Sequence, residues 1–438
     1  MKNVKKQKRN VGIQAIVQSK EYISPSVAIT HNLETEDYPK LFTIPHNIFA
    51  FIIVASILFW FSRTTTGNFI NDSKKGLIFI IFIFLAFGAL YLPDSILRRP
   101  HPIFWRLILA LSILYLFFTI FILFQNREQA WIFLKYFDSD LGEPLKEKNY
   151  ASQCDLLTNN FPYFDLEKIY NCFDIFLIAH LCGWFVKMLA VRDVYLCWFL
   201  SIFFEFLEIT FRHWLPNFWE CWWDHVILDI LICNGLGIWL GSIVCNYFDM
   251  KNYKWIIRNN NKIINMSFLD YFQPNIWVKH DWNIFSSTKR FLAVLWYIVF
   301  LNLVDLSNFF LKYLLYLPPS HYIMHVRIYI WGLLAMMSTR EYYEYLTNSS
   351  YKRIGQFLWI SHLILFSELS IILKFSSGYF TESFPIYVKY IWAMIFTLIL
   401  GIIISLLAKD LIYFFKKGVN EENIDLIEPA IDVEYVNE

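Results

Sequence analysis

The chain has 438 residues, of which 57% are hydrophobic and 20% aromatic, and its formal net charge is +1. Only 17% of the residues are charged, whereas soluble proteins average about a quarter. Apolar runs of about 20 residues recur, so we expect an all-α, polytopic integral membrane protein rather than a soluble domain. The near-neutral charge gives no reason to expect a nucleic-acid partner.

The apolar runs predict one membrane domain, residues 45–410, with about ten transmembrane helices. Residues 1–44 are polar and basic at the start, and no apolar stretch follows that start, so we expect a disordered cytosolic segment without a cleavable signal peptide. Residues 411–438 are expected to form an acidic, disordered cytosolic tail. The predicted spans are, in chain order, Ile48–Ser62, Gly76–Leu92, Ile103–Phe124, Cys172–Ala190, Val194–Arg212, Val226–Phe248, Phe291–Leu314, Tyr322–Met337, Phe357–Leu373 and Ile386–Leu407.

An even number of spans places both termini on one side of the membrane. The basic N-terminal segment and the lysine-rich segment 249–289 share that side, which the positive-inside rule identifies as cytosolic. The polar loop Gln125–Asn171 is then lumenal, and so is His213–His225, which we interpret as a loop or half-helix. Cys154 and Cys172 share the first loop, and whether they form a disulfide stays open.

Acidic side chains gather between Phe203 and Gly241, within sequence that is otherwise apolar. Ionisable groups at membrane depth are costly and mark functional sites. Glu205 and Glu208 share one face of a predicted helix, and so do Glu220 and Asp224, which are four residues apart. Two such pairs facing each other would form an all-oxygen cage of the kind that binds Ca²⁺ or Mg²⁺. The alternative is a network of salt bridges with the basic residues Arg212, His213 and Lys187.

The segment Leu215–Trp239, which reads LPNFWECWWDHVILDILICNGLGIW, resembles the signature of the eukaryotic base-exchange phosphatidylserine synthases. The resemblance extends over residues 90–410. Further matches are Asp174–Phe176 with His180 and Trp184, RPHP at Arg99–Pro102, NFFLK at Asn308–Lys312 and YYEYLT at Tyr342–Thr347.

This resemblance implies a multi-pass enzyme of the endoplasmic reticulum membrane that makes phosphatidylserine. L-serine would replace the choline or ethanolamine of phosphatidylcholine or phosphatidylethanolamine. Calcium dependence is part of what the resemblance implies, and the acid-rich cage favours Ca²⁺ over Mg²⁺. The bilayer and these substrates are the implied partners, and a homodimer stays open. The DGxxAR motif of CDP-alcohol phosphotransferases, the HKD motif and the P-loop are all absent from the sequence.

His180 lies at the same predicted depth as the carboxylates, near the lumenal ends of the spans. A lone histidine in an apolar helix is commonly an interior residue, but its match to the family's essential histidine favours a general base. Asp229 lies five residues after Asp224 and therefore points away from it on an α-helix. We expect Asp229 to orient His180 or to bind the serine ammonium. Asn217 and Asn234 are expected to support the cage or the phosphate, with helix capping as the alternative.

Two arginines have predicted ligand contacts. Arg327, near the lumenal end of its span, is expected to bind the serine carboxylate or the phosphate with its bidentate fork. Arg99 resembles a family position implicated in feedback by the product lipid, and a simple cytosolic anchor is the alternative. Asp305 and Glu368 are further acids within predicted spans, and the sequence assigns them no partner.

The sequence therefore predicts a transferase in which His180 deprotonates the serine hydroxyl. Direct displacement and a two-step route with His180 as nucleophile both stay open. The competing hypothesis is a non-enzymatic lipid or ion transporter with a structural calcium site, because intramembrane acids suit either function.

Overall fold

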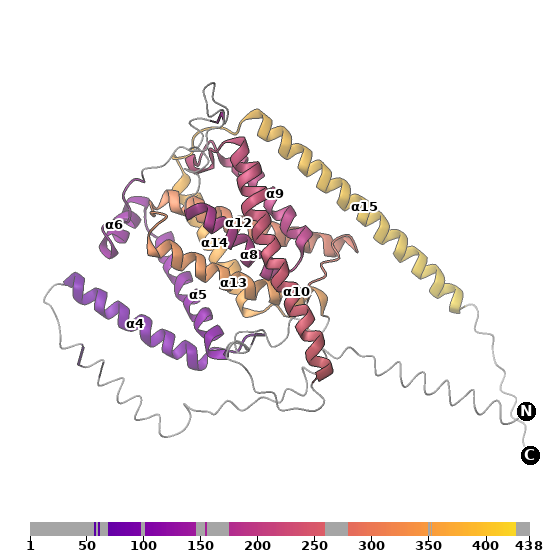
Figure 1. Ribbon diagram of the computed structural model, residues 1–438, viewed down its shortest axis with the longest axis horizontal. Helices are drawn as coiled ribbons and strands as arrows, with labels where there is room; N and C mark the ends of the chain where they lie inside the picture. Colours follow the sequence, from indigo (N-terminus) through magenta and orange to yellow (C-terminus); the bar gives the residue numbers. More distant parts are fainter. Residues whose placement is uncertain are drawn as a thin grey trace, which may run out of the picture. The chain divides into compact units, whose positions relative to one another are not determined.

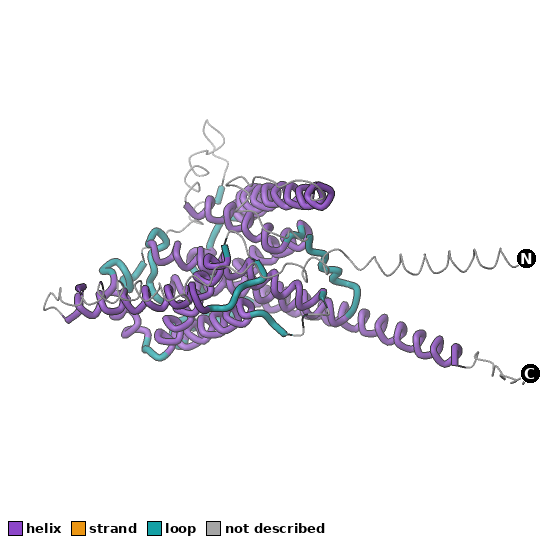
Figure 2. Tube along the Cα trace, turned by 90° about the horizontal axis from the view of Figure 1, so that it is seen from below, coloured by secondary structure: helices purple, strands orange, loops and turns teal. Residues whose placement is uncertain are grey.

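The chain divides into two units, Met1–Phe79 and Ile80–Glu438, and the helices that carry the candidate site belong to the second. The described backbone contains helices and connecting loops but no strand (Figure 2). Residues 1–44, most of the predicted span Ile48–Ser62, and Arg99 and Cys172 lie outside the described part. The computed structural model describes residues 57, 60, 61, 69–97, 101–145, 154–155, 175–258, 279–348, 351 and 353–425.

Each predicted span from Gly76–Leu92 onward coincides with a helix, although α13 and α15 run well past the predicted ends (Figure 1). They are α4 (Phe69–Tyr91), α5 (Pro102–Leu123), α6 (Arg127–Phe137), α8 (Ile175–Val191), α9 (Val194–Phe211), the 3₁₀ turn η1 (Pro216–Phe218), the π-helix η2 (Asp224–Asn234), α10 (Gly235–Arg258), α12 (Thr288–Leu314), α13 (Tyr322–Thr347), α14 (Gln356–Ser376) and α15 (Ile386–Asp425).

Seven stretches among these described helices are long and apolar enough to cross a membrane, which confirms the all-α polytopic class. They are α4, α5, α9, η2 with α10, α12, α14 and α15. α8 has a shorter apolar part, Leu177–Val191. α13 is not among the seven, because His325 and Arg327 lower the hydropathy of its first half. α15 continues past residue 410, where the sequence placed the start of the tail.

The helix α6 was not predicted, because its eleven residues lie within a loop that reads as polar. Asn126 and Gln129 form a capping box at its start. The Trp131 indole donates a hydrogen bond to the Leu314 carbonyl at 3.0 Å, so α6 packs against the end of α12.

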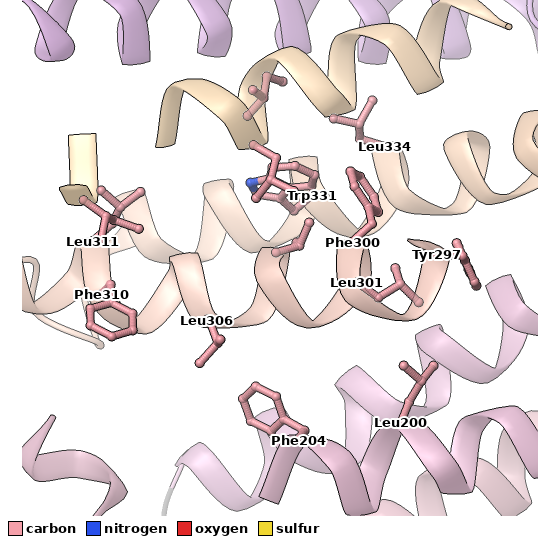
Figure 3. Close-up of a cluster of buried hydrophobic side chains, with 14 of the residues drawn as sticks. Leu200, Phe204, Tyr297, Phe300, Leu301, Leu306, Phe310, Leu311, Trp331 and Leu334 are labelled. Atoms are coloured by element: carbon pink, nitrogen blue, oxygen red, sulfur yellow. The ribbon is translucent and has the colours of Figure 1, made fainter. Parts of the chain in front are cut away.

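The core of the second unit lies around α12. Figure 3 shows α12 between α9, which contributes Leu200 and Phe204, and α13, which contributes Trp331 and Leu334. All four side chains are buried. Because lipid tails are as apolar as these residues, close van der Waals packing rather than exclusion from water holds such helices together. The membrane-length part of α15 is almost wholly exposed, as expected of a lipid-facing helix.

The two acids without an assigned partner both form ion pairs in the structure. The Glu368 carboxylate on α14 is fully buried and accepts a hydrogen bond from Arg327 Nη2 at 2.8 Å. Tyr115 of α5 and Ser307 of α12 donate to the same carboxylate, so four helices meet there. Lys187 of α8 donates to Asp305 of α12 at 2.7 Å. These pairs neutralise charges that a bilayer would otherwise penalise.

Two glycines on α10 allow α8 to approach closely. A Cβ added to Gly237 would lie 2.5 Å from the Leu181 carbonyl oxygen, and one added to Gly241 would lie 2.6 Å from Met188 Cβ. This is the small-xxx-small pattern that lets membrane helices pack backbone to backbone. Leu181 directly follows His180, so the contact sets the position of His180 relative to α10.

We predict that Gly237→Ala destabilises the protein by about 1–3 kcal/mol, because the added methyl group overpacks a helix contact. Gly332 on α13 is the matched control, since a Cβ there meets nothing within 4 Å. Gly332→Ala should leave the melting temperature of the detergent-purified protein unchanged or raise it, since alanine is the better helix former. Equal melting temperatures for the two variants would show that the α8–α10 contact is not tight.

Candidate active site

The first part of the site is a pair of carboxylates on α9. Glu205 and Glu208 are each only 3% exposed, three residues apart, and lie on the face that α9 turns toward η2. Asp193 caps the start of α9 by accepting a hydrogen bond from the Leu196 amide. The predicted shared face of the two glutamates is therefore present.

The next two acids do not form the helical pair that we predicted. Glu220 lies in the segment between η1 and η2 and is not helical, whereas Asp224 is the first residue of η2. The prediction was wrong because Pro216 begins only a three-residue 3₁₀ turn, which ends at Phe218. The Glu220 carboxylate still reaches the site from this connecting segment. Asp224 is buried at the start of η2.

The π-helix brings three polar side chains to one face. Its hydrogen bonds join residues five apart, so residues at that spacing lie almost above one another. Asp224, Asp229 and Asn234 have this spacing, and all three are buried. We expected Asp229 to point away from Asp224, which holds for an α-helix but is wrong for this one. Asp229 therefore lies on the same face as the other acids.

A histidine that the sequence analysis did not assign lies at the centre of the cluster. His225 Nδ1 is 3.0 Å from Glu205 Oε2, 3.4 Å from Glu208 Oε2 and 3.6 Å from Glu220 Oε2. An imidazole therefore lies among the carboxylates that we predicted to form an oxygen cage, and the ligand set itself stays a prediction. The signal was present in the sequence, because His225 directly follows Asp224 inside the matched motif.

His180 of α8 lies at the edge of the cluster. Its Nδ1 is 3.3 Å from Asp229 Oδ1, which agrees with the orienting role expected for Asp229. Asn234 donates to Ser201 Oγ at 2.9 Å and to Glu205 Oε1 at 3.4 Å, so it also supports the α9 carboxylate. The roles themselves stay predictions, but three helices bring these side chains together.

Several polar atoms of the cluster are buried without a hydrogen-bond partner. They include Glu208 Oε2, Glu220 Oε2 and Asn234 Oδ1. An unpaired buried polar group costs about 1–3 kcal/mol, and more if it is charged. Burial and the Glu208 carboxylate raise the pKa of the Glu220 carboxyl well above its ordinary range. A bound cation would satisfy these oxygens and favour the ionised carboxylates.

Two groups of side chains have the spacing to hold a metal ion. Glu205, His225 and Asp229 form one, and Glu208, Glu220 and His225 form the other, with ligand atoms within 4.8 Å of each other in each group. The donor set and the unpaired oxygens therefore fit a divalent cation.

The alternative was that Arg212, His213 and Lys187 form salt bridges with the carboxylates of the site. The described part of the chain does not support it. Lys187 pairs with Asp305, and Arg212 donates to the Tyr387 hydroxyl at 2.8 Å. His213 packs against the rings of Trp214 and Phe384. The basic partner of the carboxylates is His225 instead.

The remaining predicted site residues lie elsewhere. Asn217 lines a small hollow with Phe309, Lys312 and other residues of the η1 region and α12. The Arg327 guanidinium is engaged by Glu368 and Tyr115, so a contact with substrate would require it to leave these partners. Arg99 lies outside the described residues, and its regulatory role stays a prediction.

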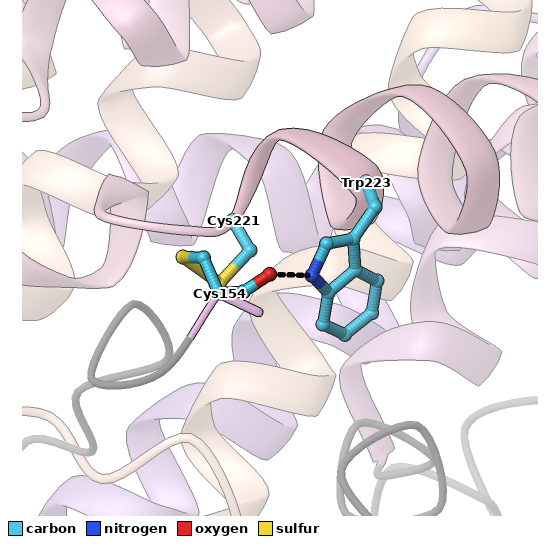
Figure 4. Close-up of a disulfide and its surroundings, with 3 residues drawn as sticks. All are labelled: Cys154, Cys221 and Trp223. Atoms are coloured by element: carbon cyan, nitrogen blue, oxygen red, sulfur yellow. Dashed lines mark hydrogen bonds between the residues drawn. A yellow bond between two sulfur atoms is a disulfide. The ribbon is translucent and has the colours of Figure 1, made fainter. Parts of the chain in front are cut away.

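A disulfide holds the segment that carries Glu220. Cys154 bonds to Cys221, and the Trp223 indole donates a hydrogen bond to the Cys154 carbonyl at 3.1 Å (Figure 4). The sequence analysis left open a disulfide between Cys154 and Cys172, and the structure shows that Cys154 bonds to Cys221 instead. Cys221 directly follows Glu220, so the bond fixes the connecting segment of the site to the distant loop around residue 154.

The residues of the cluster lie in a part of the chain that is similar to known proteins. The family model described as phosphatidyl serine synthase matches residues 100–376, which include every member of the cluster. The chain belongs to the phosphatidylserine synthase family. This assignment makes the chain an enzyme, and it disfavours the competing hypothesis of a non-enzymatic transporter.

Phosphatidylserine synthases of animals and plants are similar over most of the chain. "CDP-diacylglycerol--serine O-phosphatidyltransferase 1" of Arabidopsis thaliana is 39% identical over 362 residues, covering 80% of this chain and 85% of that protein. "Phosphatidylserine synthase 2" of Homo sapiens is 37% identical, covering 74% and 67%. "Phosphatidylserine synthase 1" of Danio rerio is 36% identical, covering 80% and 75%.

We predict that loss of the Cys154–Cys221 bond lowers phosphatidylserine synthesis roughly tenfold or more, because misplaced site groups strongly reduce rate. Cys154→Ser and Cys221→Ser should have the same effect, and so should dithiothreitol on the wild-type protein. The free, exposed Cys182 gives the matched control, Cys182→Ser. Full activity of reduced wild-type protein would show that the disulfide does not position Glu220.

Proposed function

We propose that the chain makes phosphatidylserine by calcium-dependent base exchange, with L-serine replacing the choline or ethanolamine of a phospholipid. The observation that carries the proposal is the buried cluster of Glu205, Glu208, Glu220 and Asp229 with its unpaired oxygens, next to His180. Glu220 and Asp229 lie in the matched segment Leu215–Trp239, and the whole cluster lies within the residues that the family model matches.

His180 moves the proton in this proposal. Its imidazole takes the proton of the serine hydroxyl while that oxygen forms a bond to the phosphorus of the donor lipid. The bond from phosphorus to the choline or ethanolamine oxygen breaks, and this oxygen takes up the proton from the imidazolium. One phosphodiester replaces another, so no nucleotide is consumed. A two-step route through a phosphatidyl-His180 intermediate is the alternative.

Asp229 is proposed to hold the His180 ring in place and to stabilise its protonated form, since their nearest atoms are 3.3 Å apart. When bound, Ca²⁺ would offset the charge that develops on the phosphodiester oxygens. Its proposed protein ligands are Glu205, Glu208, Glu220 and Asp224, and Asn234 would support Glu205.

Asn217 is proposed to contact the lipid phosphate from the neighbouring hollow. Arg327 is proposed to bind the anionic groups of the substrate only if its bond to Glu368 rearranges. Arg99 is proposed to bind the anionic product lipid at the cytosolic surface.

We further propose that the site opens to the lumen of the endoplasmic reticulum, with both termini cytosolic. Two observations support this orientation. Disulfides persist in oxidising compartments, and Cys154–Cys221 lies beside the site. The lysine-rich segment 249–289 begins in the last part of α10, at the opposite end of that helix from η2, as the positive-inside rule requires.

The donor lipid is the part of the proposal that most needs a test, because the Arabidopsis relative is named for CDP-diacylglycerol. The sequence lacks the DGxxAR motif of CDP-alcohol phosphotransferases, which favours base exchange. The experiment is incorporation of labelled serine into lipid by the purified chain in vesicles of phosphatidylcholine, phosphatidylethanolamine or CDP-diacylglycerol.

We expect incorporation with one or both exchange donors, and its loss on chelation of calcium. His180→Ala should lower the rate 10²–10⁴-fold, as removal of a general base typically does. Incorporation only with CDP-diacylglycerol would overturn base exchange. A His180→Ala rate above a tenth of the wild-type rate would overturn the proposed role of His180.

A further inference from the structure

One face of α12 is turned toward the helices of the site and carries a buried lysine. Asp305, Phe309 and Lys312 share this face, because they follow one another at steps of four and three residues. Asp305 pairs with Lys187 of α8 at 2.7 Å, and the centroids of the Phe309 and Phe204 rings are 6.0 Å apart. Phe204 belongs to α9, so this face of α12 contacts both α8 and α9.

Lys312 lies in the last turn of α12, where it lines a small hollow next to η1. The residue is only 7% exposed. Among the described residues that line the hollow, Lys312 carries a positive charge, Asn217 and Tyr313 are polar, and the other three are apolar. The described lining thus offers an anion one charge and two polar groups, and it contains no carboxylate that would repel the anion.

The hollow borders the segment that carries Glu220. Asn217 precedes Glu220 by three residues. The ring of Phe218, which lies between them in the sequence, packs against the ring of Phe309 with a centroid distance of 4.8 Å. Phe309 therefore contacts both η1 and α9, and an anionic group in the hollow would lie beside the elements that hold the carboxylate cluster.

The chemistry of the donor lipid suits a cation at this place. A phosphodiester has two non-bridging oxygens, and the proposed Ca²⁺ would take up charge on one of them. The second oxygen is then free to accept a hydrogen bond from an ammonium group, and lysine commonly binds phosphate as a point charge. The carboxylate of serine is also an anion, so an experiment has to distinguish the two.

We propose that Lys312 binds the phosphodiester of the donor phospholipid, with Asn217 as the second polar contact in the hollow. This inference rests on the proposed base exchange and adds a residue that binds the donor lipid rather than serine. The phosphodiester carries its negative charge in the ground state as well as in the transition state. Loss of the contact should therefore raise the KM for the donor lipid and change kcat little.

The test is the kinetics of labelled-serine incorporation by the full-length chain in micelles with a varied fraction of phosphatidylcholine or phosphatidylethanolamine. In Lys312→Met, the KM for the donor lipid should rise roughly tenfold or more, as expected when a hydrogen bond to a charged group is lost, and the KM for serine should not change. Lys312→Arg keeps the positive charge and should lose less. Lys135→Met, which removes an exposed lysine paired with Glu143, is the matched control and should behave as the wild-type protein does.

Binding gives a second readout that does not depend on turnover. Native mass spectrometry of His180→Ala protein in detergent, with added phosphatidylcholine, measures how much donor lipid is bound without reaction. Adding Lys312→Met to this variant should lower the amount of bound lipid, and adding Lys312→Arg instead should preserve most of it. The comparison of the two substitutions separates the effect of the charge from a folding defect.

The outcomes separate this inference from the proposed function. Unchanged donor KM and unchanged lipid binding in Lys312→Met would overturn the role of Lys312, while base exchange would still stand. A rise in the KM for serine alone would overturn the contact with the phosphodiester and assign Lys312 to the serine carboxylate. Absence of serine incorporation from either donor in the wild-type protein would overturn base exchange, and the binding measurement would still decide whether Lys312 binds a phospholipid.

Discussion

The structure depends on one electrostatic constraint, which is that several carboxylates are gathered in a poorly solvated layer of a membrane protein. Like charges at this spacing repel each other, and burial removes the water that would screen them. His225 offsets part of this repulsion, but Oε2 of Glu208 and Oε2 of Glu220 still lack hydrogen-bond partners. Two other acids of the membrane helices, Glu368 and Asp305, are neutralised by ion pairs with Arg327 and Lys187. This contrast supports the proposal that the cluster binds a cation.

Three features of the structure hold the side chains of this cluster in place although the carboxylates repel each other. The π-helix places Asp224, Asp229 and Asn234 on one face, which an α-helix of the same sequence would not do. Gly237 and Gly241 let α8 approach α10 and so bring His180 to the edge of the cluster. The Cys154–Cys221 bond fixes the segment of Glu220, which is the acid of this cluster that lies outside the helices. The site therefore depends on residues such as Gly237 and Gly241, which have no reactive side chain.

Much of the fold could be predicted from the sequence, because a membrane span has a strong compositional signal. The expected Val194–Arg212 and the observed α9 differ by one residue, and the predicted Ile103–Phe124 agrees equally well with α5. α6 was missed because a short amphipathic helix has no such signal.

The site could be predicted only in part. The predicted direction of a side chain was correct on an α-helix and wrong on the π-helix. Glu205 and Glu208 share a face as expected, whereas the direction of Asp229 was wrong, since nothing local in the sequence announces a π-helix. The Cys154–Cys221 pair joins positions that are 67 residues apart, and such a pairing is a property of the folded chain. His225 lies in the matched motif, but we assigned it no role because we predicted a site made only of oxygen ligands.

The central claim is that the buried cluster binds a divalent cation, and equilibrium dialysis of the purified chain against ⁴⁵Ca²⁺ tests it most directly. The account predicts saturable binding by the wild-type protein and a loss of affinity of about tenfold or more in Glu208→Gln, because ligand charge sets Ca²⁺ affinity. Glu143→Gln, which changes an exposed acid paired with Lys135, should bind as the wild-type protein does. Equal binding by Glu208→Gln and the wild-type protein would contradict the account.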